Sequence, residues 1–191
     1  MGDWGDLRER ALERYRAGER DLADDADERQ RQLTRMGNAA GAAALCSLMA
    51  GRDDAREWFA RAAERYRESW PDARWALEAG AAESESPIGR YAAALALLVL
   101  GDWHGARVAA DYARTHETFP DEVADALAFI AVEDVVGYVE AVEAVLESFE
   151  TRDAYLEDIP VADTVLVLQA LAGRRGISAE LESELLPGST P

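Results

Sequence analysis

The sequence has no lysine, one cysteine and two histidines among its 191 residues. A single cysteine cannot form an intramolecular disulfide, and Cys46 lies in an apolar run where a small buried thiol is expected. Long apolar segments are also missing, since the longest, 91–100, is far shorter than the roughly 20 residues that cross a bilayer. Residues 1–30 are charged throughout and lack the apolar part of a signal peptide. These absences predict a cytoplasmic, soluble protein.

The common motifs of catalysis and metal binding are absent too. The chain has no HExxH pair, no GxSxG elbow, no Walker loop and no GxGxxG loop. His104 and His116 are twelve positions apart, without partners at metal-ligand spacing. The acidic run 24–28 lacks the alternating ligands and central glycine of a calcium loop. We therefore predict no catalytic residue, no cofactor and no metal site, although a carboxylate pair among 38 acidic residues would leave no signature.

Negative charge dominates what is present. There are 38 acidic residues against 20 basic ones, all arginine, and the formal net charge is −18. Self-repulsion of this size destabilises a compact chain, but molar salt shortens the Debye length to about 3 Å. The composition resembles that of proteins from salt-accumulating, halophilic archaea; an acidic protein from a GC-rich genome is the alternative. Since the arginines are interleaved with acids, nucleic acid and anionic membranes are disfavoured as partners.

The apolar residues, mostly alanine, leucine and valine, follow a helical rhythm. A nearly all-apolar helix over 38–50 is expected to end at Gly51, which takes the left-handed conformation without penalty. Asp53 or Asp54 then caps a second, two-faced helix. Its predicted buried stripe, with spacings of three and one, consists of Ala55, Trp58, Phe59, Ala62, Ala63 and Tyr66.

A second pair of helices has the same parts in the same order. Ser86-Pro87 provides an N-cap and first residue for a buried helix over 88–100. Gly101 ends that helix, and a two-faced helix follows over 106–115. A short extra helix is expected over 72–83, between the two pairs.

A third pair is predicted over 123–132 and 135–149. Aligning it with the second pair gives an offset of 32 positions, which places Gly137 opposite Gly105. The valine-rich member is predicted to be a helix because its apolar residues have helical spacing, whereas a strand would need alternation. The outer face of this helix is acidic and consists of Glu140, Glu143, Glu147 and Glu150.

The two ends of the chain complete the predicted organisation. Residues 1–36 should form one long charged helix, or two helices broken near Ala17-Gly18. A last long helix is expected over 161–172, followed by a short one over 179–185. We predict one domain, in which the N-terminal segment 1–36 joins an array over 37–187, and a frayed tail at 188–191.

One stretch, 43–66, resembles a tetratricopeptide repeat unit. It has small residues, then Gly51, then an Ala-x3-Phe/Trp-x3-Ala pattern. The Trp-Leu-Gly-Tyr order of that family's first helix is missing. Gly51 and Gly101 place the first and second pairs 50 positions apart, and this offset and that of 32 are close to the period of helix-pair solenoids. The predicted fold class is all-α, an array of antiparallel helical hairpins, with an ordinary alanine-rich bundle as the alternative.

A second resemblance is to the immunity protein 49 family. An apolar helix over 165–172, the turn Gly173-Arg174-Arg175-Gly176-Ile177 and a closing Leu186-Pro187 are similar to the end of those domains. The Gly-Asp-Trp turn at 101–103 fits the same family. The resemblance implies an all-α protein that binds and neutralises a toxin partner.

Aromatic residues at element ends are the clearest candidates for binding, since exposed tryptophans often dominate interfaces. Trp58 is instead expected in the core because it lies on an apolar stripe. The predicted partner-binding residues are Trp70, Trp75, Trp103, His104, Glu140, Glu143 and Glu147.

From these patterns we predict a non-enzymatic, protein-binding helical-repeat module, either monomer or homodimer, whose partner is another polypeptide. One alternative is an enzyme that uses carboxylates and arginines in a cleft between helices. The other is a self-associating structural protein that pairs through its N-terminal helix and its valine stripe.

Overall fold

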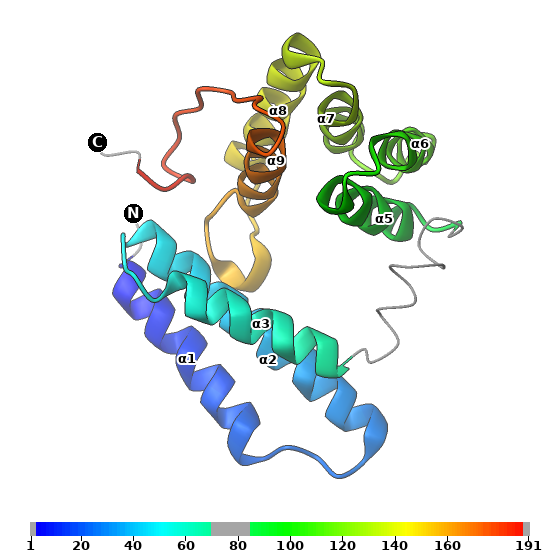
Figure 1. The fold of residues 1–191 in the computed structure, drawn as a ribbon. Coiled ribbons are helices and arrows are strands. Elements are labelled where there is room, and N and C mark those ends of the chain that lie inside the picture. The colour runs from blue at the N-terminus through cyan, green and yellow to red at the C-terminus, as the bar shows by residue number, and fades with distance from the viewer. Residues whose placement is uncertain (1–2, 70–84, 189–191) are drawn as a thin grey trace. The chain divides into compact units, whose positions relative to one another are not determined.

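Helices make up nearly all of the regular structure. A computed structural model describes residues 3–69 and 85–188, and within these ranges it contains no strand (Figure 1). The all-α prediction is confirmed for this part of the chain. None of the helices described there is both long and apolar enough to cross a bilayer. The elements are α1 (Trp4–Arg20), α2 (Ala26–Met49), α3 (Ala55–Ser69), α5 (Pro87–Leu100), α6 (Trp103–Arg114), α7 (Asp121–Val132), α8 (Val135–Glu150), η3 (Leu156–Asp158) and α9 (Asp163–Gly173).

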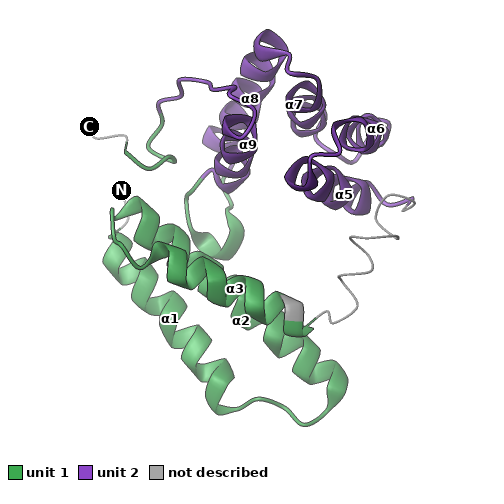
Figure 2. Ribbon diagram, viewed as in Figure 1, with its two compact units in different colours: residues 1–73, 153–161, 183–191 green, residues 74–152, 162–182 purple. Residues whose placement is uncertain are grey.

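The described residues divide into two compact units (Figure 2). Unit 1 comprises 3–69, 153–161 and 183–188, and unit 2 comprises 85–152 and 162–182. Within unit 1, α2 packs against both α1 and α3; within unit 2, each helix from α5 to α8 packs against the next. Consecutive helices are therefore packing partners, while their membership of a repeat array stays a prediction.

Alanine allows the helices of unit 1 to approach closely. Ala40, Ala43 and Ala44 of α2 are completely buried. Cys46 is also buried, as predicted, and this burial raises the pKa of its thiol to about 11. At Gly37, a β-carbon would lie 2.7 Å from the ring of Tyr66, so only glycine lets α3 lay that ring on α2.

The N-terminal helices are divided differently from the prediction. The break lies at 21–25, not near Ala17-Gly18, because Asp25 caps α2 by accepting a hydrogen bond from the Glu28 N–H at 3.0 Å. Gly18 stays inside α1, where it makes room for the side chain of Met36. Helix α2 then runs through positions 36 and 37 without interruption, so it begins twelve residues before the predicted 38.

The predicted stripe of α3 is only half correct. Ala55 and Ala62 are buried, and Trp58 is half-buried with its ring edge-on to Tyr15, 5.4 Å between centroids. Phe59 remains 41% exposed, and Ala63 and Tyr66 are exposed too. The covered stripe is narrower because α3 packs chiefly against the single helix α2.

The valine-rich segment of unit 2 is helical, as its spacing predicted. Helix α8 buries the residues that recur at three- and four-residue spacing, namely Tyr138, Ala141, Val142, Val145, Leu146 and Phe149. At the start of the unit, Ser86 and Pro87 occupy the predicted N-cap and first position of α5. Helix α6 begins at Trp103, three residues before the predicted start.

The predicted terminal helix over 179–185 is wrong, since the chain has no helix within 177–188. The side chain of Gln169 in α9 accounts for this difference. Its Nε2 donates to the Ala179 carbonyl at 2.7 Å, and its Oε1 accepts from the Ala179 N–H at 3.4 Å. A tertiary contact therefore takes the backbone groups that a helix at this point would have used.

Candidate interaction site

Two turns of unit 2 share one backbone plan: 101–105 joins α5 to α6, and 133–137 joins α7 to α8. The first residue of each turn is left-handed, with φ of 82° at Gly101 and 58° at Glu133. The N–H of the following aspartate donates to the carbonyl five residues earlier, at 2.9 Å and 3.0 Å. This is the hydrogen bond that closes a helix in a Schellman turn.

The same aspartates also start the next helices. The carboxylate of Asp102 accepts from the Gly105 N–H at 2.9 Å, and that of Asp134 accepts from the Gly137 N–H at 3.0 Å. Both glycines are tightly enclosed. A β-carbon at Gly105 would lie 2.7 Å from the Asp102 carboxylate, and one at Gly137 would lie 2.8 Å from the Phe129 ring. The Asp-x-x-Gly spacing thus builds both turns.

Each turn exposes the two residues between its aspartate and its glycine. In the first turn they are Trp103, 36% exposed, and His104, which is also exposed. In the second they are Val135 and Val136, 50% and 70% exposed. Position for position, Trp103 corresponds to Val135 and His104 to Val136, and all four side chains are exposed.

Arg175, in the turn after α9, ties the two turns together. Its Nη1 donates to the carbonyls of Ile130 and Ala131 at 3.1 and 2.6 Å, at the end of α7 where helical partners run out. Its guanidinium also pairs with Glu133 and lies 4.1 Å from the centroid of the Trp103 ring. With only 11% of its side chain exposed, Arg175 acts as an internal strut.

Arg174 makes the corresponding contact with α5. Its Nη2 donates to the Val99 carbonyl at 3.0 Å, in the last turn of that helix. The twin arginines after α9 therefore bind the C-terminal ends of both α5 and α7. This places the two turns along one edge of unit 2.

Exposed apolar side chains gather along that edge. Six of them, 36% to 75% exposed, come from the ends of α5 and α7 and the starts of α6 and α8. We call this set the apolar edge; it consists of Val99, Leu100, Trp103, Val132, Val135 and Val136.

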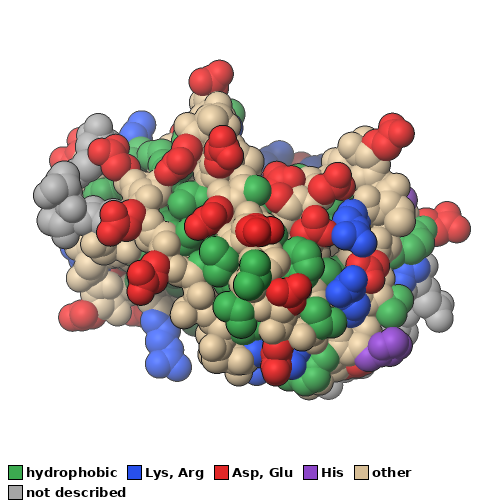
Figure 3. All heavy atoms as spheres, turned by 90° about the horizontal axis from the view of Figure 1, so that it is seen from above, with side chains coloured by type: hydrophobic (Ala, Val, Ile, Leu, Met, Phe, Trp, Pro, Cys, Tyr) green, Lys and Arg blue, Asp and Glu red, His purple; other side chains and the backbone are tan. Residues whose placement is uncertain are grey.

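The apolar edge continues into an acidic stripe along α8. Counting from Val136, the fourth, seventh and eleventh residues are Glu140, Glu143 and Glu147, and this spacing keeps all four on one side of the helix. All three glutamates are exposed. On the face that Figure 3 draws, acidic side chains are scattered around a group of hydrophobic ones.

The predicted binding residues fall into three groups. Trp103 belongs to the apolar edge, with His104 beside it, and the three glutamates form the acidic stripe. Trp70 and Trp75 lie outside the described residues. Arg174, Arg175 and the aliphatic members of the edge were not among the predicted binding residues. The 32-position repeat of Asp-x-x-Gly, noted in the sequence only at its glycines, indicates the second turn.

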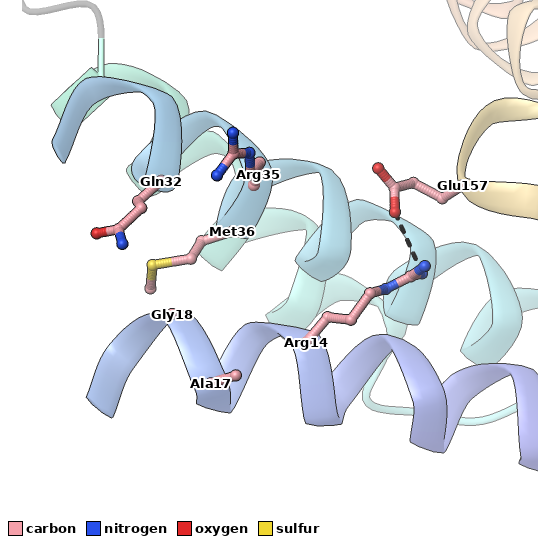
Figure 4. A pocket seen from close by; sticks show the side chains of 7 residues that line it. All are labelled: Arg14, Ala17, Gly18, Gln32, Arg35, Met36 and Glu157. Atoms are coloured by element: carbon pink, nitrogen blue, oxygen red, sulfur yellow. Dashed lines mark ion pairs between the residues drawn. The ribbon is translucent and has the colours of Figure 1, made fainter. Parts of the chain in front are cut away.

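Unit 1 has a different surface feature, a groove of about 530 Å³ beside α1 and α2. Figure 4 shows Met36 reaching from α2 toward Gly18 of α1, and Arg14 facing Glu157 of η3. The Arg14 and Glu157 charges pair at 3.2 Å. The lining residues are Arg14, Ala17, Gly18, Gln32, Arg35, Met36 and Glu157.

Unit 1 also contains a buried polar group with a hydroxyl, a guanidinium and a carboxylate in contact. Ser47 is fully buried and accepts from Arg8 Nε at 2.9 Å, while Arg8 pairs with Asp54 at 2.5 Å. Burial alone would raise the pKa of Asp54, but hydrogen bonds from Arg52 and Ser47 and the charge of Arg8 lower it. Because its pKa is lowered, the Asp54 carboxylate is a weak base toward Ser47, and the group links α1, α2 and the turn before α3.

Comparisons with protein families, with curated proteins and with solved structures gave no match to this chain. Within residues 3–69 and 85–188, no three histidine, cysteine, aspartate or glutamate side chains are grouped so that they could hold a metal ion.

Proposed function

We propose that the chain is a non-enzymatic protein-binding module, and that another polypeptide docks on the apolar edge. The observation that carries this proposal is the gathering of six exposed apolar side chains from four helix ends. Single exposed apolar residues are ordinary on protein surfaces. A contiguous group is not, because exposing it to water is unfavourable, and such groups mark interaction sites.

The edge is also held rigidly before any partner arrives. Two aspartate caps fix the helix starts, and Arg174 and Arg175 fix the helix ends. A preformed surface loses little conformational entropy on binding, so more of the contact free energy appears as affinity. Trp103, braced by the guanidinium of Arg175, is the natural centre of such an interface.

The neighbouring charges indicate the chemistry of the partner. A partner whose apolar side chain covers Leu100 and Val136 would extend along α8, past Glu140 and Glu143. Lysine or arginine beside that side chain would match these glutamates, while acidic residues would be repelled. A second copy of the chain would bring the same acidic stripe, so a different, basic polypeptide is favoured.

The predicted helical-repeat fold, immunity-like role and halophilic origin are compatible with protein binding at the apolar edge, which does not require them. A helical-repeat module commonly presents a surface to another chain, and an immunity-like protein that neutralises a toxin would be one such binder. The large negative charge supports a protein adapted to high salt, in which apolar contacts strengthen and exposed ion pairs weaken. Cytoplasmic localisation remains part of this proposal.

A peptide library with defined anchors tests the proposal. Peptides carrying Trp, Phe or Leu, flanked by either Arg/Lys or Asp/Glu, would be selected on the immobilised chain in molar KCl. The selected peptides should combine an apolar anchor with basic flanks. Their affinity should fall about tenfold in Leu100→Glu and in Val136→Glu, because each places a charge in the apolar edge.

Ile88→Glu is the matched control, because Ile88 is 65% exposed at the opposite end of the helix that carries Leu100. It should leave the affinity unchanged. Equal losses in Leu100→Glu and Ile88→Glu would contradict a localised site. A dimer seen by light scattering, and lost in Leu100→Glu, would instead favour the self-association alternative.

A further inference from the structure

Unit 1 gathers positive charge within a chain whose net charge is −18. The groove beside α1 and α2 shares Arg14 and Ala17 with a second hollow of about 740 Å³ along α1. Among the described residues, the acidic ones that line these hollows are Glu13 and Glu157. The arginines that line them are Arg10, Arg14, Arg16, Arg20 and Arg35.

Several of these arginines are available to a ligand. Within the described part of the chain, Arg10 and Arg20 make no hydrogen bond or ion pair. Arg35 is 68% exposed and meets Glu28 only at 3.4 Å. In these ranges, Glu157 is the one ion-pair partner of Arg14. In the described ranges, Arg10 and Arg20 are therefore unpaired, and Arg14, Arg16 and Arg35 each have one acidic partner.

The bottom of the groove is apolar. Ala17 and Gly18 contribute it together with the edge of Met36, which is only 3% exposed because the missing β-carbon of Gly18 lets it lie directly on α1. Gln32 also lines the groove, but its amide is occupied: Oε1 accepts from the Ala23 N–H at 2.7 Å and Nε2 donates to the Asp21 carbonyl at 3.2 Å. A ligand would therefore meet an apolar surface between positive charges.

Glu157 places its carboxylate against Arg14, where the negative group of an anionic ligand would bind. It lies in the left-handed region, φ 56° and ψ 24°, as does the next residue, Asp158, with φ 58°. Non-glycine residues rarely adopt this conformation. The backbone thus pays a cost at a position that brings a carboxylate to Arg14.

We propose that this groove binds an amphiphilic organic anion, such as a medium-chain carboxylate or phosphate ester. Its charged group pairs with Arg14 and Arg35, and its apolar chain lies on Met36 and Ala17. The ligand's anion competes with Glu157 for Arg14, so Glu157 limits the affinity. This site lies in unit 1 and is independent of the apolar edge in unit 2.

Calorimetric titrations with octanoate and octyl phosphate test the proposal, at the lowest salt concentration at which circular dichroism shows the chain folded. Both probes should bind, and inorganic phosphate and octyltrimethylammonium should bind more weakly. The double variant Arg14→Gln/Arg35→Gln should weaken binding about tenfold, whereas Glu157→Gln should strengthen it about threefold because it frees Arg14.

Two matched controls separate the site from general charge. Arg56→Gln removes an exposed arginine of α3 away from the groove, and Asp158→Asn removes a carboxylate next to Glu157 with the same backbone conformation. Both should leave the affinity unchanged. Equal tightening in Asp158→Asn and Glu157→Gln would overturn the proposal, as would equal binding of the cationic probe. Binding of inorganic phosphate as tight as that of octyl phosphate would show that the apolar surface takes no part and would overturn it too.

Discussion

The turn between α5 and α6 and the turn between α7 and α8 have one backbone and two different surfaces. Aspartate and glycine occupy matching positions in both, Asp102 with Gly105 and Asp134 with Gly137, and make the same hydrogen bonds. The residues between them differ completely, a tryptophan and a histidine against two valines. In these two turns the aspartate and the glycine fix the backbone, and the same backbone carries two different exposed pairs.

The residue before each aspartate, Gly101 or Glu133, has a left-handed backbone, and this conformation costs the two residues different amounts of free energy. Gly101 adopts φ 82° without strain, whereas Glu133 adopts φ 58° against a preference of about 1–2 kcal/mol. The carboxylate of Glu133 recovers part of this cost through its pair with Arg175. The second turn is therefore the more strained of the two and depends more on its side-chain contacts.

Removing the shared strut should have the largest effect. Arg175→Ala leaves the carbonyls of Ile130 and Ala131 without their charged donor and unbraces Trp103, and should lower the free energy of unfolding by about 2–3 kcal/mol. Arg174→Ala removes one exposed bond and should cost below about 1 kcal/mol. Urea unfolding in molar KCl gives both values; similar losses would contradict the central role of Arg175.

Adding a methyl group at the two matching glycines should distinguish the turns next. Gly137→Ala forces the half-buried Phe129 ring to move and should cost about 2 kcal/mol. Gly105→Ala meets only the rotatable carboxylate of Asp102, so it should cost about 1 kcal/mol, the value of a lost cap. Thermal unfolding of the two variants measures the difference. A larger loss at Gly105 would contradict the packing argument.

Exchanging the left-handed residues should change the free energy of unfolding by about 1 kcal/mol or less. Gly101→Ala introduces only backbone strain, since its β-carbon would make an ordinary 3.5 Å contact, and should cost about 1 kcal/mol. Glu133→Gly relieves strain but loses the pair with Arg175, so its net effect should be within about 0.5 kcal/mol of zero. Equilibrium unfolding decides; a large loss in Glu133→Gly would mean that the ion pair outweighs the strain.

The effect of Tyr138 should appear at alkaline pH; this residue lies in the first turn of α8 and donates to Gln169 at 2.9 Å. Burial raises its pKa to about 12, so the folded state favours the protonated phenol. The stability it contributes is therefore fully present below the pKa of about 10 of an unfolded tyrosine and is lost as pH rises toward 12. In Tyr138→Phe, alkaline unfolding followed by circular dichroism should lose part of this dependence; an unchanged profile would assign it to other groups.

Periodicity predicted the helices well where one face is buried throughout. Helix α8 could be predicted despite its valines, since apolar spacing identifies a helix whatever its β-branching. It failed where glycine serves packing: Gly18 suggested a break, but it accommodates Met36 inside α1. It also failed at 179–185, where Gln169, distant from the pattern itself, captures the backbone of Ala179.

The candidate site was predicted only in part for a related reason. Trp103 and the glutamates of α8 could be chosen from residue type and spacing alone. The apolar edge could not, because it exists only when Arg174 and Arg175 bring helix ends together that are more than 30 positions apart in sequence. Residue type gives no sign that these two arginines bind carbonyls instead of solvent.

The order in which the chain visits the two units has a practical consequence. Residues 3–69 belong to unit 1, 85–152 to unit 2, 153–161 to unit 1, 162–182 to unit 2 and 183–188 to unit 1. Neither unit can be excised as one continuous fragment, and synthesis from the N-terminus cannot finish the first unit until nearly the whole second one has left the ribosome. A nick in one of these linking segments would therefore yield pieces that stay associated, since each unit is assembled from separated stretches.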